Sequence, residues 1–203
     1  MRVGIFGGSF DPVHFGHLLL AESAREQCPL DAVRFLPAAD PPHKQGQLQA
    51  SAEDRAMMLE LAIAGYEPFF VCRYEIDRGG VSYTVETLTR LRAVEPDAEL
   101  FFLLGADMLH DLPHWRQAAR ICELSVPVAV RRAGVGEPDF GCLAEIASAE
   151  RIGYFRRHQV EMPAVDLAST DLRRRVAQGR SIRYRTPRAV EEYIRSHGLY
   201  RGE

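Results

Sequence analysis

Residues 2–17 read Arg-Val-Gly-Ile-Phe-Gly-Gly-Ser-Phe-Asp-Pro-Val-His-Phe-Gly-His, which combines an apolar run, two adjacent glycines and two histidines. The apolar run Arg2–Phe6 predicts a short buried strand that ends in Gly7-Gly8. The stretch Gly16–Gln27, rich in leucine and alanine, predicts a helix. The sequence therefore predicts that the chain opens with a strand, a glycine-containing turn and a helix.

The rest of the chain continues this alternation. Further strands are predicted at Ala32–Leu36, Phe69–Cys72, Glu99–Leu104, Pro127–Val130 and Gln159–Met162. Helices are predicted from Ser51 to about Gly65 and at Thr84–Val94, His114–Cys122, Ser169–Gln178 and Pro187–His197. Alternating strands and helices favour a parallel α/β sheet. We expect a Rossmann-like, doubly wound parallel sheet with helices on both faces and a helical C-terminal end from about residue 165. The length of 203 residues fits a single domain over residues 1–203.

The composition argues against several other classes of protein. With 46% hydrophobic residues the chain can bury a core, which disfavours disorder. No apolar run approaches the roughly 18 residues of a transmembrane helix, and the apolar N-terminal stretch is too short for a signal peptide. The four cysteines form no C-x-x-C pair, so neither a zinc knuckle nor a disulfide framework is indicated. A cytoplasmic protein without membrane contact is the expectation.

The charge is distributed unevenly along the chain. The formal net charge is −3, but residues 1–150 carry −9 and residues 151–203 carry +6. A basic end can bind nucleic acid or phosphate ligands, or it can be a solvated helical face. On charge alone the solvated face is favoured, and no nucleic-acid partner is expected. Lys44 is the only lysine and Trp115 the only tryptophan.

The junction after the first predicted strand carries the residues best suited to chemistry. Gly7 and Gly8 permit a close ligand approach. His14 and His17 are three residues apart, near the predicted start of a helix, where unpaired N–H groups attract anions. Two imidazoles there could donate to phosphate oxygens. The alternatives are a capping or surface role, or a zinc site, which needs a third ligand that the sequence does not supply nearby. Neither G-x-G-x-x-G nor G-K-[ST] is present, which disfavours dinucleotide-binding dehydrogenases and P-loop enzymes.

Two motifs resemble those of the H-x-G-H nucleotidyltransferase superfamily. The first is Gly-Ser-Phe-Asp-Pro-Val-His-Phe-Gly-His at residues 8–17. The second is Leu-Ala-Ser-Thr-Asp-Leu-Arg at residues 167–173, which resembles I-S-S-T-x-I-R but has Ala168 where serine is usual. The resemblance implies transfer of AMP or CMP from a nucleoside triphosphate to an acceptor that bears a phosphate.

The middle and the end of the chain resemble the bacterial nicotinate-mononucleotide adenylyltransferases. The similar segments are Pro41–Lys44, Gly79–Thr84, Leu104–Asp107, Leu112–Trp115, Val130–Arg132 and Pro187–Tyr200. The resemblance implies that ATP and nicotinate mononucleotide give deamido-NAD and pyrophosphate, in NAD biosynthesis. Sibling enzymes that use nicotinamide mononucleotide or pantetheine phosphate are the alternatives, together with a non-catalytic nucleotide sensor. The pantetheine family generally has threonine at the position of His14.

The resemblance also implies roles for individual residues. His14, His17 and Arg173 would be catalytic and contact the ATP phosphates. The other predicted ATP-binding residues are Gly7, Ser9, Phe10, Gly105, Asp107, Ser169 and Thr170. For Asp107, a carboxylate suits a ribose hydroxyl, and the alternative is an N-cap of the following helix. Mg²⁺ would be carried by ATP, with no metal ligand from the protein.

The acceptor would be bound by Gly8, Lys44, Thr84 and Trp115. Trp115 presents a flat face for a pyridine ring, and core packing is the alternative. The backbone at Thr84 would bind the nicotinate carboxylate, and Lys44 would reach the mononucleotide phosphate unless it is a plain surface lysine. Arg131 and Arg132 could equally bind nucleotide or be solvated. A homo-oligomer is compatible with the sequence.

Overall fold

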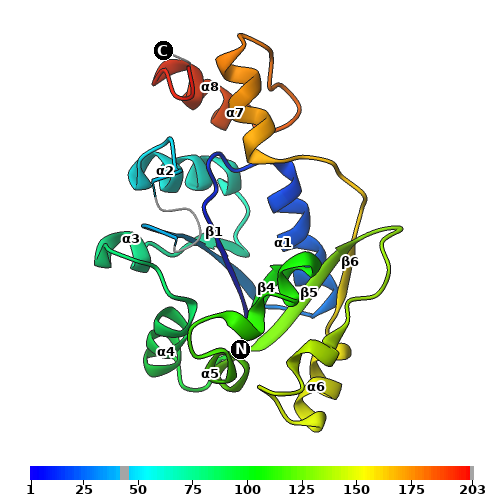
Figure 1. The fold of residues 1–203 in the computed structure, drawn as a ribbon. Coiled ribbons are helices and arrows are strands. Elements are labelled where there is room, and N and C mark those ends of the chain that lie inside the picture. Colours follow the sequence, from blue (N-terminus) through cyan, green and yellow to red (C-terminus); the bar gives the residue numbers. More distant parts are fainter. Residues whose placement is uncertain (42–45, 202–203) are drawn as a thin grey trace. The chain divides into compact units, whose positions relative to one another are not determined.

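A computed structural model describes residues 1–41 and 46–201. In these residues the strands form a six-stranded sheet with the order β3-β2-β1-β4-β5-β6 (Figure 1). The strands are β1 (Arg2–Gly8), β2 (Ala32–Pro37), β3 (Phe69–Val71), β4 (Glu99–Gly105), β5 (Val126–Arg132) and β6 (Val160–Met162). This is the strand order of doubly wound dinucleotide-binding proteins, in which the order reverses beside the first strand. The predicted Rossmann-like α/β class is confirmed.

Most predicted helices are present, with small shifts at their ends. The described residues form α1 (Phe15–Gln27), α2 (Ala52–Ile63), α3 (Tyr74–Arg78), α4 (Thr84–Val94), α5 (Ala118–Leu124), α6 (Ala149–Arg156), α7 (Ser169–Ala177) and α8 (Arg188–Ser196). The predicted N-cap of α2 is confirmed, because the Ser51 side chain accepts from the Asp54 backbone N–H. The prediction of one helix over His114–Cys122 is wrong. Gln117 adopts a left-handed conformation with φ of 53°, so that α5 begins only at Ala118.

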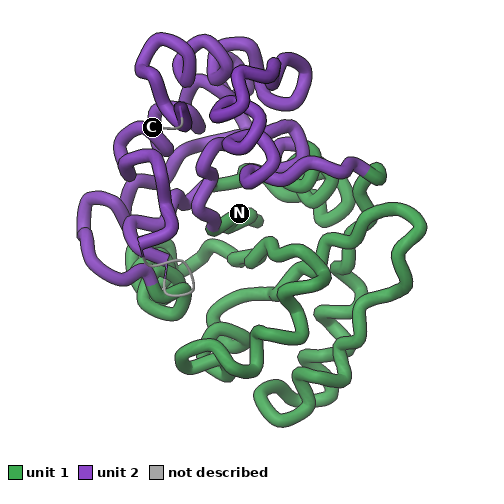
Figure 2. Tube along the Cα trace, turned by 45° about the horizontal axis from the view of Figure 1, so that its top comes forward, with its two compact units in different colours: residues 1–7, 19–34, 83–164 green, residues 8–18, 35–82, 165–203 purple. Residues whose placement is uncertain are grey.

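The described chain divides into two compact units (Figure 2). Unit 1 contains residues 1–7, 19–34 and 83–164, and unit 2 contains residues 8–18, 35–82 and 165–203. Each unit gathers segments that are distant in the sequence. The single domain over residues 1–203 stays a prediction.

Unit 1 is organised around β4, whose neighbours β1 and β5 both run parallel to it. Every residue from Leu100 to Leu104 is buried, as in strands covered on both faces. Gly4 in β1 is required by packing, since a Cβ there would lie 2.9 Å from Cδ1 of Leu30. The helix α4 packs against α5 at one side of this unit.

Unit 2 contains the C-terminal helices. The helix α8 packs against α2, with Val190 and Ile194 as its buried side chains. The Tyr193 hydroxyl donates to Oδ1 of Asp54 in α2 at 2.9 Å. This hydrogen bond connects α8 to α2.

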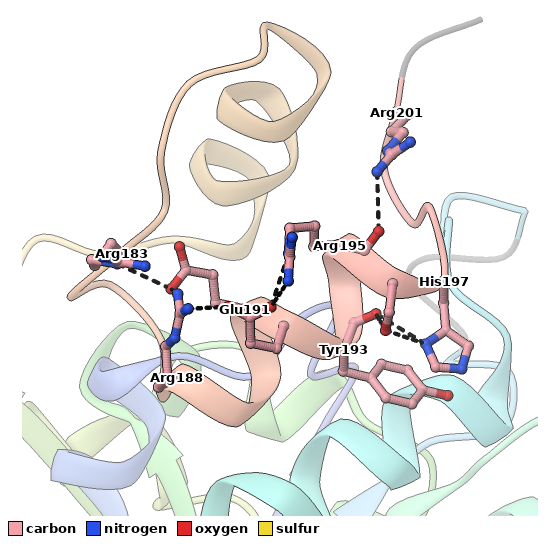
Figure 3. Close-up of polar contacts among 9 residues, drawn as sticks. Arg183, Arg188, Glu191, Tyr193, Arg195, His197 and Arg201 are labelled. Atoms are coloured by element: carbon pink, nitrogen blue, oxygen red, sulfur yellow. Dashed lines mark hydrogen bonds and ion pairs between the residues drawn. The ribbon is translucent and has the colours of Figure 1, made fainter.

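Many arginines of the basic end pair with carboxylates along α8 (Figure 3). Arg183 and Arg188 both lie against Glu191, at 3.5 and 2.8 Å, and Arg195 Nε donates to Glu192 at 2.8 Å. Such exposed ion pairs contribute little to the free energy of unfolding, because solvent and salt screen them. For these arginines the structure favours the solvated helical face over a ligand site.

Candidate active site

The first strand ends at two glycines with different surroundings. Gly7 is exposed, and a Cβ added there would meet no atom within 4 Å. Gly8 is different, because a Cβ there would lie 2.9 Å from Cζ of Phe10. The Phe10 side chain is only 1% exposed and packs on Phe35, with ring centroids 5.8 Å apart. Residues 9–14 connect β1 to α1 and are called the histidine loop. Because the Phe10 side chain is buried, only the backbone of Phe10 could face the ATP that the sequence predicts there.

His14 and His17 form a stacked pair at the start of α1. Their ring centroids are 3.7 Å apart with an interplanar angle of 17°. The His14 backbone N–H donates to Nδ1 of His17 at 3.2 Å, and the His17 backbone N–H donates to the His14 carbonyl at 2.9 Å. Because Nδ1 of His17 accepts, the neutral ring carries its proton on Nε2. The backbone thus presents His17 Nε2–H as a hydrogen-bond donor.

Three consecutive carbonyls of this loop accept side-chain donors from the C-terminal segment. Arg173 Nη1 donates to the Asp11 carbonyl at 2.8 Å. Ser169 Oγ donates to the Pro12 carbonyl at 2.9 Å, and Thr186 Oγ1 to the Val13 carbonyl at 2.8 Å. The structure therefore joins the two sequence motifs, 8–17 and 167–173, within one compact unit (Figure 2).

These contacts limit what the second motif can offer a phosphate. Ser169 has a single hydroxyl proton, which it already donates in its hydrogen bond to the Pro12 carbonyl. A phosphate at Ser169 or the exposed Thr170 would thus meet backbone N–H groups or the Thr170 hydroxyl. Arg173 Nε is buried and has no hydrogen-bond partner among the described residues. Because protein atoms cover this nitrogen, it does not identify a ligand contact, and the role of Arg173 toward ATP stays a prediction.

Asp11 lies at the centre of the loop, although sequence analysis did not select it. Its carboxylate is 1% exposed and accepts from the backbone N–H groups of Gln49 and Ala50 at 3.0 and 3.2 Å. The Tyr200 hydroxyl donates to Oδ1 at 2.7 Å, and Arg173 Nη1 lies 3.8 Å from Oδ2. Asp11 therefore ties the histidine loop to two other segments of the chain.

Arg55 in α2 is a second buried charge that sequence analysis missed. It is 1% exposed and donates to the carbonyls of Ser9 and Ala39 at 2.8 and 3.3 Å. Burial lowers the pKa of Arg55, and the nearby Asp11 carboxylate opposes that shift. Arginine remains charged throughout the physiological range. Arg55 and Arg173 thus place two positive charges around the single carboxylate of Asp11, beneath a loop predicted to bind phosphates.

In unit 1, Gly105 is the last residue of β4, and Asp107 lies in the 3₁₀ helix that follows it. Gly105 is the N-cap of the 3₁₀ helix Ala106–Leu109, so the alternative that Asp107 itself is the N-cap is wrong. The Asp107 carboxylate lies so close to Gly105 that a Cβ added at residue 105 would collide with Oδ1 of Asp107. Asp107 lies in the first turn, where a carboxylate is electrostatically favourable. Its predicted role toward a ribose stays a prediction.

Trp115 and Thr84 also belong to unit 1. Trp115 is half-buried and packs edge-to-face on Phe102 of β4, with centroids 5.8 Å apart. Its neighbour Arg116 lies 4.4 Å from the Tyr83 ring centroid and pairs with Glu86 at 2.9 Å. Arg116 thus connects the Trp115 segment to the start of α4, where Thr84 is the first residue. The structure brings these two predicted acceptor residues into one region.

The remaining candidates have other surroundings. Arg131 pairs with Glu161 at 2.6 Å and donates to the Val135 carbonyl at 2.8 Å, which favours a structural role. Arg132 is exposed. Lys44 lies outside the described residues. In the described part of the chain, no group of three or more His, Cys, Asp or Glu side chains is placed to hold a metal ion.

Comparison with known proteins identifies the family. The family model described as cytidylyltransferase-like matches residues 5–175. A protein of Thermomicrobium roseum is 46% identical over 200 residues, covering 98% of this chain and 92% of its own length. A protein of Thermus thermophilus is 47% identical over 201 residues, covering 99% and 100%. Both are named as probable nicotinate-nucleotide adenylyltransferases.

A solved structure shows the same fold at much lower sequence identity. The Plasmodium falciparum nicotinic acid mononucleotide adenylyltransferase complexed with NaAD aligns with a TM-score of 0.74 and 16% identity. The alignment covers 98% of this chain and 97% of that one. Among the described residues, no helix combines the length and the apolar character needed to cross a membrane. With close relatives aligned over nearly its whole length, the chain belongs to the cytidylyltransferase-like family and, within it, to the nicotinate-nucleotide adenylyltransferases.

Proposed function

We propose that this protein transfers AMP from ATP to nicotinate mononucleotide, giving deamido-NAD and pyrophosphate. The observation that carries the proposal is the stacked His14–His17 pair, which the backbone holds with His17 Nε2–H as a donor at the start of α1. Helix N-termini favour anions, and positioned donors stabilise the charge that develops on phosphate oxygens. Family membership and this loop point to the same chemistry.

The reaction proceeds by direct displacement. A 5′-phosphate oxygen of nicotinate mononucleotide forms a bond to the α-phosphorus of ATP, and the bond from that phosphorus to the bridging oxygen of pyrophosphate breaks. The leaving pyrophosphate takes the electron pair, so that no protein nucleophile is needed. The protein positions two polyanions and neutralises their charge. His17 and Arg173 would donate to phosphate oxygens, while Arg55 adds a buried positive charge behind the loop.

Mg²⁺ accompanies ATP in this proposal. Phosphate oxygens and water would supply its ligands, because Mg²⁺ usually keeps several waters and binds substrate phosphates. The ion would neutralise charge on the triphosphate. On the acceptor side, a backbone N–H at the start of α4 would favour a nicotinate carboxylate over an amide. The carboxylate has two acceptor oxygens and a negative charge, whereas an amide has one neutral acceptor oxygen and would form the weaker hydrogen bond with that donor.

One assay tests the proposal against its rivals. Purified protein is mixed with ATP, Mg²⁺ and one of three acceptors: nicotinate mononucleotide, nicotinamide mononucleotide or pantetheine phosphate. Pyrophosphate release is then measured. We expect the highest kcat/KM with nicotinate mononucleotide. Preference for the amide or for pantetheine phosphate would identify a sibling enzyme, and binding of ATP without turnover of any acceptor would indicate a nucleotide sensor.

Gly7→Ala tests whether a ligand occupies the open space beside β1. The added methyl group meets no protein atom and strains no left-handed backbone, so we expect an unchanged or slightly higher free energy of unfolding. If ATP approaches the backbone here, the KM for ATP rises about tenfold, the size of a single lost contact of about 1.4 kcal/mol. Gly136→Ala is the matched control, because its Cβ also meets open space. Equal ATP affinity in the two variants would remove Gly7 from the ATP site.

Trp115→Phe tests stacking on the pyridine ring. The smaller ring keeps an aromatic contact with Phe102 but loses part of the flat surface. We expect a KM for nicotinate mononucleotide raised about three- to tenfold, as for the loss of an aromatic contact of about 0.5–1.5 kcal/mol. The KM for ATP should stay unchanged. A lower melting temperature with both KM values unchanged would show that Trp115 serves the core alone.

The remaining expectations are outside these tests. A cytoplasmic location, a homo-oligomer and the absence of a nucleic-acid partner stay predictions.

A further inference from the structure

The loop that carries His14 is held mainly by residues from the end of the chain. Its carbonyls at positions 11–13 accept from Arg173, Ser169 and Thr186. The Phe15 backbone N–H donates to the Arg185 carbonyl at 3.1 Å. All of these residues belong to unit 2. These partners lie more than 150 positions away from the loop in the sequence.

Tyr200 makes the most distant of these contacts. Its side chain is 8% exposed, and its hydroxyl donates to Asp11 Oδ1 at 2.7 Å. Burial, assisted by the Asp11 carboxylate, raises the pKa of Tyr200 far above the physiological range. The phenol therefore remains protonated and remains a donor at every working pH. A charge-assisted hydrogen bond of this kind is among the stronger ones in proteins.

Asp11 transmits this contact to the histidines. The Tyr200 phenol and the Ala50 N–H both donate to Oδ1 of the carboxylate, and the Gln49 N–H donates to Oδ2. Three residues further along, the His14 N–H sets the tautomer of His17. Because the donor of that 3.2 Å hydrogen bond is a backbone N–H of the loop, displacement of the loop backbone would weaken it.

We propose that Tyr200, acting through the Asp11 carboxylate, is a positioning residue that keeps the His14–His17 loop in its catalytic conformation. The proposal rests on the proposed adenylyl transfer for its kinetic consequence. Tyr200 touches no substrate in this account. Its effect is on the orientation of His17 Nε2–H, and hence on kcat more than on substrate binding.

Tyr200→Phe isolates the hydroxyl, since the ring that fills the buried site is kept. We expect kcat to fall about 10- to 100-fold, as small displacements of catalytic groups do, with the KM for nicotinate mononucleotide within about twofold of the wild-type value. Tyr193→Phe is the matched control. It removes another phenol–aspartate hydrogen bond of the C-terminal segment, to Asp54, which is outside the loop. That variant should keep the wild-type kcat.

Thr186→Val provides a second variant with nearly the same side-chain shape. It removes the donor to the Val13 carbonyl, and we expect a fall in kcat in the same direction as for Tyr200→Phe. This variant keeps the inference testable if Tyr200→Phe is poorly folded. A wild-type kcat in Thr186→Val would contradict positioning of the loop from the C-terminal segment.

A spectroscopic measurement separates positioning from general loss of structure. At about pH 8, where an ordinary histidine is neutral, the ¹⁵N shifts of the His17 ring report its tautomer. The wild-type protein should show only the Nε2–H form, and Tyr200→Phe a mixture of both forms. An unchanged tautomer in Tyr200→Phe, a kcat within twofold of wild type, or an equal loss of kcat in Tyr193→Phe would each overturn the inference. The tautomer result decides it even if wild-type protein turns over no acceptor, an outcome that would refute the proposed function separately.

Discussion

His17→Ala is expected to lower kcat by about 100- to 1,000-fold, the usual cost of removing one donor that acts on charge in the transition state. The structure gives the reason. The His14 backbone N–H occupies Nδ1 of His17, so Nε2–H is the group that can donate to a phosphate oxygen. Initial rates at saturating ATP and nicotinate mononucleotide measure the effect.

The folded state should survive this substitution. His17 is half-buried and contacts the rings of His14 and Phe10, so we expect a loss of about 1 kcal/mol in the free energy of unfolding. His197→Ala is the control, because His197 also stacks on an aromatic ring, that of Tyr193, at 3.9 Å (Figure 3). It should leave kcat unchanged. A His17→Ala protein with more than a tenth of the wild-type kcat would contradict the transition-state role.

Arg55→Met is expected to produce the largest loss of stability, about 3 kcal/mol. The substitution keeps an apolar chain of similar length but removes a buried charge. The carbonyls of Ser9 and Ala39 lose their donors, and Asp11 loses a nearby positive charge in a buried setting. Urea unfolding at neutral pH measures the change.

Arg73→Met is the matched control for a charge at the surface. Arg73 pairs with Glu53 at 2.7 Å, but its side chain is 35% exposed. Exposed pairs of this type typically contribute about 0–1 kcal/mol. Equal destabilisation by the two substitutions would show that the buried charge of Arg55 has no special part in holding the loop.

Much of the fold could be predicted from the sequence because its strands are short apolar runs bounded by glycine, proline or polar residues. The bounds of α4 agree with the prediction, and β1, β2 and β4 differ from it by one or two residues. The helices α3 and α6 were missed. The first has five residues, and the second has only Ile152 and Phe155 buried, too little for a clear apolar period. The helix α5 begins late because Gln117 adopts a left-handed backbone conformation. This conformation could not be predicted from the residue type, because glutamine rarely adopts it.

The candidate site divides in a similar way. The two motifs 8–17 and 167–173 could be found because each is a contiguous pattern, and the structure brings them together through Ser169 and Arg173. The residues that hold the loop, Asp11, Arg55, Thr186 and Tyr200, could not be assigned from spacing alone. Their contacts join positions up to 189 residues apart, and such pairings arise only from the folded topology. For Asp11 and Tyr200 the only available signal was their place in segments that resemble the family.

The basic end of the chain has two kinds of arginine. Arg183, Arg188 and Arg195 pair with glutamates on α8, as a solvated helix face does. Arg173 instead lies against the histidine loop, with a buried nitrogen that has no partner among the described residues. Net charge alone could not separate these two groups, because all four arginines lie within some twenty residues.

The proposed function depends on one chemical step, the direct attack of the acceptor phosphate on the α-phosphorus of ATP. The most direct measurement uses ATP with a chiral thiophosphate at the α-position, together with nicotinate mononucleotide and Mg²⁺. The configuration at phosphorus in the deamido-NAD product is then determined. A single in-line displacement predicts inversion. Retention would require a covalent adenylyl-protein intermediate, and that result, or the absence of product, would contradict the account.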